Sequence, residues 1–449
     1  MERIIKNDSF CCDNKMENEI KEYKSNLPDY DAKKGQLQIR INAWYSPNPT
    51  EQAFTEYKEC GFNHIFLIGN TVGELGDPRI EQALALCDKF DIKAFIDCGN
   101  KIQNCFDYAK YNQYRSFVGF NIDEPMLYYN TVNHKQGITE MKDYIDDFER
   151  LFPWKCFLVN MNPTTSLPIF KGDAKDYDEY IQGVCTCILE NVKNGDKWLS
   201  VDDYPIMYEE QGKKYHLKPS WLGQLEYMAH YKKMSDDIKT NMFIQVMSYY
   251  PLHERAVTVA DIKLQLYCCL AFHFDMLSYF CYHTPALSCE FSEKDVAIVD
   301  RNGKKQSIWD DVKQLNSELK RFEHIYMQFR HWQGAYTLIG TNNRFDGYRN
   351  ETLFLRFPLE EDQLGELKSI TSTEDCLITL AMDDVDNCAY TVVNYNETML
   401  AKKNVVTMQF KNACYAQVFK NGNKRIVELK DHKLTVHLDV GEGIYVIPD

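Results

Sequence analysis

The sequence predicts a (β/α)8 barrel, or TIM barrel, followed by an antiparallel β-sandwich, and two patterns support this. Between about residues 36 and 330, short apolar runs alternate eight times with amphipathic stretches, which indicates a parallel sheet connected by helices. Eight such units at this length fit a β/α barrel, and a doubly wound sheet is the alternative. From about residue 335, short apolar runs at regular spacing are separated by turn residues, which is typical of a β-sandwich.

The eight barrel strands are expected where short apolar runs begin and end sharply. They are residues 38–43, 64–68, 92–97, 117–122, 156–160, 198–202, 242–247 and 276–282. Amphipathic segments between and after them predict helices at 51–60, 80–90, 137–151, 176–193, 220–239, 258–273 and 309–328. Gly61 follows the first helix at the position where a left-handed residue commonly ends a helix.

The C-terminal part predicts nine strands joined by polar turns such as Asn421-Gly-Asn423. These strands are expected at residues 335–340, 351–357, 376–382, 389–395, 405–410, 416–419, 425–428, 433–438 and 443–447. Residues 1–35 are polar and predict an N-terminal arm or surface helix. We therefore expect three parts: the arm at 1–35, the barrel at 36–330 and the sandwich at 331–449.

Composition excludes several classes of partner. A net charge of −15, from 51 basic and 66 acidic residues, argues against nucleic acid or an anionic membrane as the main partner. The N-terminus has no apolar signal region and the chain has no run of 18 apolar residues, so a cytoplasmic location is expected. The 16 cysteines are scattered, which favours buried free thiols over a disulfide framework. The sequence does not indicate an oligomeric state.

The most informative segment is Ser116 to Pro125. It predicts a buried strand that ends in two carboxylates, Asp123 and Glu124, before a proline that cannot continue a central strand. Burial penalises charge, so a carboxylate pair at this place is costly unless it has a role. The C-terminal ends of barrel strands are where catalytic residues lie. The first hypothesis is therefore an acid/base enzyme with Glu124 as the leading residue.

The other strand ends carry carboxylates, amides and aromatic residues, with almost no Lys or Arg. They include Trp44, Tyr45, Asn70, Asp97, Asn160, Asp202, Asp203, Tyr204, Gln245 and Tyr282. This set suits a neutral, polyhydroxylated ligand, because amides and carboxylates bond hydroxyl groups and aromatic rings stack on sugar rings. A phosphorylated ligand would need basic residues or a Gly-rich loop, and neither is evident. The 11 histidines show no metal-ligand spacing, so we expect neither a metal nor a cofactor.

Glycoside hydrolysis needs two carboxyl groups, one protonated and one ionised. We expect Glu124 to be the general acid/base, and Asp202 or Asp203 on strand six to be the nucleophile or the base that activates water. At least one of those two aspartates is expected to anchor the loop before Tyr204. Asp123 is either a structural carboxylate or a residue that tunes Glu124. The expected sugar-binding residues are Trp44, Tyr45, Asn160, Tyr204, Gln245 and Tyr282.

Three segments carry a resemblance to known enzymes. Phe120-Asn-Ile-Asp-Glu-Pro125 resembles the acid/base strand of clan A glycoside hydrolases, in which Asn-Glu-Pro or Asp-Glu-Pro closes strand four. Residues 255–267, leading to 277–282, resemble helix seven and strand eight of bacterial proteins similar to family 42 β-galactosidases, and residues 419–446 resemble the β-sandwich that often closes such enzymes. The resemblance implies a hydrolase of carbohydrate metabolism with Glu124 as acid/base.

One departure from clan A leaves the second catalytic group open. The resemblance implies a nucleophilic Glu at the end of strand seven, but residues 242–248 contain no carboxylate. Asp202 or Asp203 is then the second group, or the mechanism resembles that of barrel hexosaminidases, with Asp123 positioning a substrate acetamido group. The competing hypothesis is a non-catalytic carbohydrate-binding protein on a hydrolase-like barrel. A lyase acting on acidic sugars is less favoured, because the strand ends lack basic residues.

Overall fold

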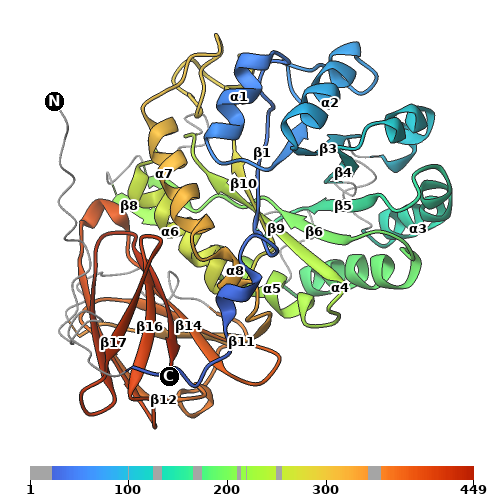
Figure 1. Ribbon diagram of the computed structural model, residues 1–449. Helices are drawn as coiled ribbons and strands as arrows, with labels where there is room; N and C mark the ends of the chain where they lie inside the picture. The colour runs from blue at the N-terminus through green and yellow to red at the C-terminus, as the bar shows by residue number, and fades with distance from the viewer. Residues whose placement is uncertain are drawn as a thin grey trace.

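The computed structural model describes residues 23–99, 101–124, 134–164, 174–209, 214–218, 220–248, 255–341 and 355–449. It contains the predicted barrel of parallel strands and the predicted antiparallel sandwich, which lie side by side (Figure 1). The barrel precedes the sandwich in the chain. Helices α6, α7 and α8 lie on the side of the barrel that faces the sandwich.

The barrel sheet has eight strands in the order β1-β10-β9-β6-β5-β4-β3-β2, and every pairing is parallel. The strands are β1 (Arg40–Ala43), β2 (His64–Leu67), β3 (Lys93–Asp97), β4 (Phe117–Asp123), β5 (Cys156–Met161), β6 (Lys197–Val201), β9 (Ile238–Gln245) and β10 (Met276–Phe280). Hydrogen bonds from Asn63 N to Ile41 O (3.1 Å) and from Ser46 N to Ile68 O (3.3 Å) join the ends of the sheet. The strands therefore form a nearly closed barrel, as predicted.

The helices also lie close to their predicted positions. They are α1 (Glu51–Glu59), α2 (Pro78–Phe90), α3 (His134–Leu151), α4 (Ala174–Asn191), α5 (Trp221–Lys232), α6 (Val259–Ala271), α7 (Ile308–Lys320) and α8 (Glu323–Tyr326). Local sequence explains where several of these helices begin. For example, Pro78 occupies the first turn of α2, and the side chain of Asp77 accepts a hydrogen bond from Arg79 N.

Two predicted helices were too long. The segment 220–239 ends as helix α5 at Lys232, because a turn around Ser235 and Asp237 follows it and β9 begins at Ile238. The segment 309–328 is divided into α7 and α8 at Phe322, whose backbone leaves the helical conformation (φ −127°). The ring of Phe322 packs on Phe419 of the sandwich at 5.7 Å, so tertiary packing overrides the helical pattern there.

Several elements were not predicted from the sequence. A 3-10 helix, η3 (Ile102–Gln113), connects β3 to β4, and a hairpin of β7 (Ile206–Glu209) and β8 (Lys214–Leu217) follows β6. The sandwich strand β12 (Leu367–Ser372) was missed because three of its six residues are Ser or Thr and one is Lys. These elements matter for function, since η3 and the hairpin both follow strands that end at the candidate site.

The sandwich has a six-stranded and a three-stranded sheet, in the orders β11-β13-β14-β19-β16-β17 and β12-β15-β18. The strands are β11 (His331–Leu338), β12, β13 (Cys376–Met382), β14 (Cys388–Asn394), β15 (Asn404–Phe410), β16 (Tyr415–Lys420), β17 (Asn423–Glu428), β18 (Lys433–Leu438) and β19 (Gly443–Pro448). A predicted strand at 351–357 falls mostly outside the described residues, and 355–357 are not in a strand. One apolar cluster fills the space between the two sheets.

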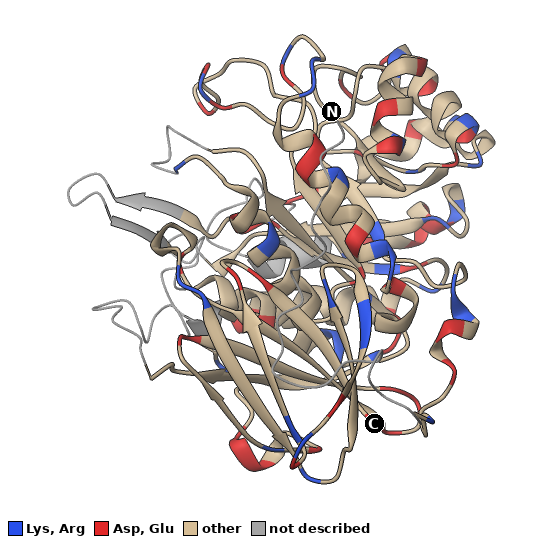
Figure 2. Ribbon diagram, turned by 60° about the vertical axis from the view of Figure 1, so that its left-hand side comes forward, with Lys and Arg blue, Asp and Glu red and all other residues tan. Residues whose placement is uncertain are grey.

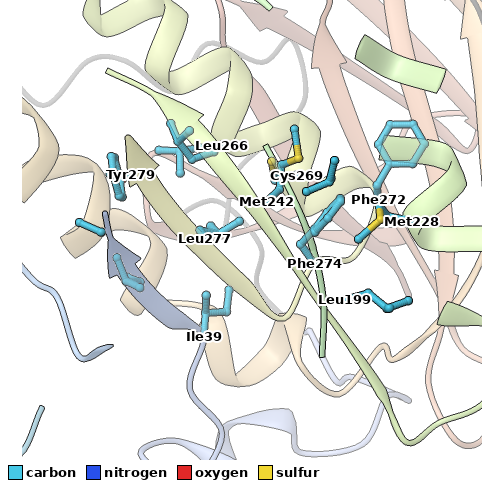
Figure 3. Packing of buried hydrophobic residues seen from close by; sticks show 14 of the residues in the cluster. Ile39, Leu199, Met228, Met242, Leu266, Cys269, Phe272, Phe274, Leu277 and Tyr279 are labelled. Atoms are coloured by element: carbon cyan, nitrogen blue, oxygen red, sulfur yellow. The ribbon is translucent and has the colours of Figure 1, made fainter. Parts of the chain in front are cut away.

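Apolar side chains pack on both faces of the barrel sheet. Outside, Figure 3 shows Met242 of β9 and Leu277 of β10 with Leu266 and Cys269 of α6, all within one large buried cluster. Inside, the barrel is filled by large side chains, among them Trp44, Phe66, Phe95, Trp198 and Phe243. The barrel interior is therefore a packed core and not a pore, which leaves the rim of the strands as the place for a site.

The described part of the N-terminal arm joins the barrel to the sandwich. It contains the short 3-10 helix η2 (Tyr30–Lys33), and residues 1–22 lie outside the described residues. The hydroxyl of Tyr30 donates to Asp383 of the sandwich (2.6 Å), whereas Asp31 pairs with His324 of α8 (2.9 Å). These contacts tie residues 23–35 to both larger units.

The surface carries mixed charge. Figure 2 shows acidic and basic residues interspersed along the outer helices and strands. Among the described cysteines none forms a disulfide and most are buried, in agreement with the predicted free thiols. Within the described ranges, no helix is both long enough and apolar enough to cross a membrane.

Gly119 of β4 supplies a direct test of the barrel register. A methyl group at this position would lie 2.2 Å from the carbonyl oxygen of Cys156 on β5, which is backbone and cannot move aside. Gly119→Ala is expected to destabilise the protein by about 2–4 kcal/mol, measured by thermal or urea unfolding. Gly334→Ala is the matched control, since a methyl there meets only the flexible end of Leu359. Equal effects of the two substitutions would contradict the β4–β5 register.

Candidate active site

Carboxylates from three barrel strands meet at the C-terminal rim. Asp97 closes β3, Asp123 closes β4 with Glu124 directly after it, and Asp202 directly follows β6. Their charges act on one another: Asp202 and Asp123 both raise the pKa of Glu124, and Asp97 raises that of Asp123. We call these four residues the carboxylate group.

Asn160, at the end of β5, connects two members of the carboxylate group. Its Nδ2 donates to Asp123 Oδ1 and to Asp202 Oδ1, each at 2.9 Å. Since both oxygens lie 2.9 Å from one nitrogen, they are separated by at most twice that distance. The strand order β4-β5-β6 places Asn160 between the two aspartates, so its role follows directly from the topology.

A chain of hydrogen bonds inside the barrel fixes the orientation of Asn160. Ser200 Oγ donates to Asn160 Oδ1 (2.8 Å) and accepts from Asn241 Nδ2 (2.7 Å), while Ser278 Oγ donates to Asn241 Oδ1 (2.7 Å). These three residues are fully buried on β6, β9 and β10. Because Asn160 Oδ1 accepts from Ser200, its amide hydrogens face the carboxylates.

Burial raises the pKa of every member of the carboxylate group, and repulsion by neighbouring carboxylates adds to it for Asp123, Glu124 and Asp202. The pKa of Glu124 is raised to about 8, by burial first and then by Asp202 and Asp123. Burial followed by Asp123 raises the pKa of Asp202 to about 7, and burial followed by Asp97 raises that of Asp123 to about 7. The pKa of Asp97 is raised to about 6 by burial. At neutral pH the group therefore holds protons, with Glu124 the last to ionise.

Two residues at the rim have left-handed backbone conformations. Glu124 has φ 40° and Tyr45 has φ 54°, values that residues other than glycine rarely adopt. The strand end is held by hydrogen bonds from Asp123 N to Gly99 O and from Glu124 N to Asn160 O, both 2.9 Å. Such strain persists where the surroundings impose it, and it concentrates at functional sites.

Aromatic side chains form one wall beside the carboxylate group. The ring of Phe280 lies 6.2 Å from Tyr45, 5.3 Å from Tyr204 and 6.4 Å from Phe291. Tyr45 and Tyr204 are partly exposed, so part of each ring is open to a ligand. Burial, and then the neighbouring Cys281, Glu290 and Asp123, raise the pKa of the Tyr45 hydroxyl, which keeps it a neutral hydrogen-bond donor. This wall suits stacking on a sugar ring.

Three of the predicted site residues are used for structure instead. Asp203 is fully buried and pairs with Lys218 after the hairpin, which makes it the loop anchor of the two strand-six aspartates. Gln245 is buried and its Oε1 accepts from Ile206 N (3.0 Å). Tyr282 is buried against Tyr57 of α1, with ring centres 4.7 Å apart. We therefore assign no sugar contact to Gln245 or Tyr282.

Trp44 also differs from its predicted role. Its ring packs on Phe66 (5.1 Å) and Phe243 (5.6 Å), and only 7% of the residue is exposed. It belongs to the aromatic filling of the barrel, where it supports the adjacent Tyr45. Tyr45 follows the end of β1 in a left-handed backbone conformation (φ 54°), which gives the two adjacent residues different surroundings.

Glu290 is a member of the site that the sequence did not indicate. It lies in the loop after β10, ten residues beyond the strand end, and its charge raises the pKa of both Asp123 and Glu124. No periodic pattern marks such a loop residue. Asp97, by contrast, had the same signal as Asp123, a carboxylate at the end of an apolar run.

In the described part of the chain, no set of three or more His, Cys, Asp or Glu side chains is arranged to hold a metal ion.

Comparisons with known proteins give distant structural likenesses. No protein-family model matches the sequence, and no curated protein matches it. Among solved structures, a family 39 glycoside hydrolase from Bacteroides cellulosilyticus WH2 has 10% identity and a TM-score of 0.49, over 92% of this chain and 81% of that one. A family 27 β-L-arabinopyranosidase from Geobacillus stearothermophilus also has 10% identity and a TM-score of 0.49, over 92% and 97%.

A third likeness is to an endo-β-1,4-mannanase from Thermotoga petrophila, with 9% identity and a TM-score of 0.41, over 91% of this chain and 99% of that one. All three of these structures are of glycoside hydrolases. Likenesses this distant identify neither a family, family 42 included, nor a substrate or a catalytic residue of this chain.

Proposed function

We propose that this protein hydrolyses an O-glycosidic bond in a neutral oligosaccharide, with Glu124 as general acid/base and Asp202 as the second carboxyl group. One observation carries the proposal: Glu124 lies among buried carboxylates whose mutual repulsion separates their pKa values. Glycoside hydrolysis requires such a pair, one carboxyl protonated and the other ionised near working pH. The tyrosine wall adds groups that bind a sugar, whereas the buried amide of Asn160, which was expected to contact the sugar, bonds Asp123, Asp202 and Ser200 instead.

In the proposed reaction, protonated Glu124 donates its proton to the glycosidic oxygen as the bond to the anomeric carbon breaks. Ionised Asp202 either attacks that carbon or removes a proton from the attacking water. If Asp202 attacks, water then displaces it from the anomeric carbon and gives its proton to Glu124, which restores both carboxyl groups. In either version water adds across the cleaved bond, so the products are two sugars with free hydroxyl groups. Asn160 holds Asp202 in place through one oxygen (2.9 Å). Asp123 shares that amide and raises the pKa of Glu124, which keeps the acid protonated.

An acetamido sugar would give Asp123 a different role. In that case Asp123 orients the acetamido group, which attacks the anomeric carbon in place of Asp202, and Glu124 remains the acid. Asp202→Asn distinguishes the two versions. A direct role of Asp202 predicts loss of activity on every substrate, whereas substrate assistance predicts that activity survives on N-acetylated sugars only.

A carbohydrate-binding protein without turnover is the second candidate. One observation favours it: β9, the seventh barrel strand, ends at Gln245, and residues 246–248 add no carboxylate. The test is a panel of 4-nitrophenyl glycosides and unsubstituted oligosaccharides, assayed for released nitrophenol or new reducing ends. Turnover by the wild-type protein supports hydrolysis. Sugar binding without any turnover supports the binding protein.

The pH dependence follows from the same pKa values. Activity needs ionised Asp202 and protonated Glu124, so kcat/KM should fall below about pH 7 and again above about pH 8. We expect a narrow bell with its maximum between these values. The acidic and basic sides of the pH profile report apparent pKa values of the whole carboxylate group, because its members titrate together. A plateau that extends to pH 5 would contradict a raised pKa of the second carboxyl group.

Asn160 is expected to act as a positioning residue. Asn160→Ala removes the hydrogen bonds that favour the ionised forms of Asp123 and Asp202, so both pKa values should rise. We expect kcat to fall by about 10–100-fold and the acidic limb of the pH profile to move upward by about one unit. A lower rate with an unchanged pH profile would indicate a purely structural role for Asn160.

A further inference from the structure

A cavity adjoins the carboxylate group. It has a volume of about 900 Å³, within the range of small-molecule pockets, and lies between the ends of β2 and β3 and the helix η3. Tyr45 and Asp97 line it, and both also belong to the candidate active site. A ligand at the carboxylate group can therefore continue into this space. The proposed mechanism gives the cavity no function.

The lining of the cavity has the chemistry of a site for uncharged sugars. Three amides, Asn70, Gln103 and Asn104, line it together with the carboxylates of Glu74 and Asp107. Among the described residues that line it there is no Lys or Arg. Amide and carboxylate groups bond sugar hydroxyls, whereas a uronate, sulfate or phosphate would face uncompensated negative charge.

Two details show that the walls of the cavity are held in place. Asn104 Nδ2 donates to the carbonyl oxygen of Cys98 (2.8 Å), which fixes η3 to the end of β3. Gly69, at φ 99°, lies so close to Tyr45 that a methyl group there would be 2.0 Å from the ring. The Tyr45 ring is therefore held between its strand and the β2 loop. Gln103, in the first turn of η3, also lines the cavity.

We infer that this cavity is a further sugar subsite, so that the substrate is an uncharged oligosaccharide with at least one ring beyond the two that flank the cleaved bond. The inference rests on the proposed function, because it places the cleaved bond at the carboxylate group. A ring in the cavity stacks on Tyr45 or Tyr108 and bonds Gln103 through a hydroxyl. The protein then prefers longer chains to disaccharides.

The test compares the hydrolysis of oligosaccharides of different length by the wild type and by variants at Gln103. The substrates are cello-, manno-, xylo- and malto-oligosaccharides of two to five units, with trigalacturonate as the charged counterpart. For the hydrolysed series, kcat/KM should rise at least tenfold from the disaccharide to a longer chain. Gln103→Ala and Gln103→Trp, which remove the amide and fill the cavity, should reduce that ratio by about 5–50-fold. Gln52→Ala and Gln52→Trp, on the exposed face of α1, are the matched controls.

The outcomes separate the subsite from the catalytic proposal. Hydrolysis with a length preference that only the Gln103 variants reduce supports the subsite. Hydrolysis without a length preference, or with one that both Gln103 variants retain, overturns the subsite and leaves the proposed function intact. If no series is hydrolysed, the proposed function fails for these sugars, and calorimetric titration with the tetrasaccharides decides the subsite. Binding that Gln103→Trp abolishes then supports it, and absence of binding overturns it.

Discussion

Glu124→Gln is expected to lower kcat by about 10³-fold or more without loss of the fold or of sugar binding. Glutamine keeps the shape of the side chain but has no proton to give to the leaving oxygen, and general acid catalysis contributes about 10²–10⁴-fold. The measurement is kcat on the best unsubstituted oligosaccharide, whose leaving sugar needs a proton, with Kd for the same sugar from calorimetry. Glu59→Gln, an exposed carboxylate at the end of α1, is the matched control and should keep wild-type activity.

The same variant carries an internal check on folding. Burial and neighbouring charges hold the pKa of Glu124 above its ordinary value, to about 8. This group therefore lowers the stability of the folded protein as pH rises from the ordinary carboxyl pKa to about 8, and the full cost remains above that pH. Glu124→Gln should therefore be at least as stable as the wild type at pH 9. A variant that is folded, binds sugar and retains more than a tenth of the wild-type kcat would remove Glu124 from the catalytic role.

Arg255→Ala is expected to have the largest effect on stability. Arg255 is 5% exposed and lies where the barrel meets the sandwich. Its Nη1 and Nη2 donate to the two carboxylate oxygens of Asp261 on α6, and Nη2 also donates to Glu397 of the sandwich, all at 2.7 Å. The substitution removes the guanidinium and leaves the buried carboxylates of Asp261 and Glu397 without its positive charge. We expect the free energy of unfolding to fall by about 3–5 kcal/mol.

Arg330→Ala is the matched control for this prediction. Arg330 also pairs with an aspartate, Asp384, at 2.8 Å, but its side chain is 55% exposed. An exposed pair contributes about 0–1 kcal/mol, so the two substitutions should differ severalfold in urea or thermal unfolding. We call Arg255 and its partners Asp261 and Glu397 the Arg255 cluster. Similar effects of the two substitutions would mean that the contact between the barrel and the sandwich does not depend on this cluster.

The Arg255 cluster is also connected to the strand ends. Asp261 lies in the first turn of α6, and Gln265 follows it by one turn. The side chain of Gln265 accepts from Gln245 N (2.7 Å) and donates to Gln245 O (3.0 Å) at the end of β9. Weakening the cluster should therefore loosen the rim of the barrel as well as the contact with the sandwich.

The strands were more predictable than the roles of individual residues. Two sandwich strands, β13 and β18, have the bounds that the apolar runs indicated, because alternation and turns mark them locally. The carboxylates Asp123 and Glu124 follow a buried strand, as predicted. The division of roles between Asp202 and Asp203 depends on Lys218, which reaches Asp203 through an unpredicted hairpin. No local pattern contains that contact.

For aromatic residues at strand ends, the local sequence also did not show which side chains line a cavity and which are buried. Tyr45 and Tyr282 both follow barrel strands, but Tyr45 lines a cavity and Tyr282 is buried against α1. Which side of the barrel a residue faces depends on where its strand ends, and the eighth strand ends two residues earlier than predicted, at Phe280. Glu290 reaches the site from a loop, so its position depends on the folded chain alone.

The most direct test of the central claim is how the activity lost in Glu124→Gln depends on the leaving group. The measurement is kcat/KM, wild type against variant, for aryl glycosides of one sugar with leaving groups from 2,4-dinitrophenol to 4-methoxyphenol. If Glu124 protonates the leaving oxygen, the loss should stay below about tenfold for dinitrophenolate, which needs no proton, and rise to about 10³-fold for the least acidic phenol. An equal loss for every leaving group would contradict the assignment of Glu124 as the acid.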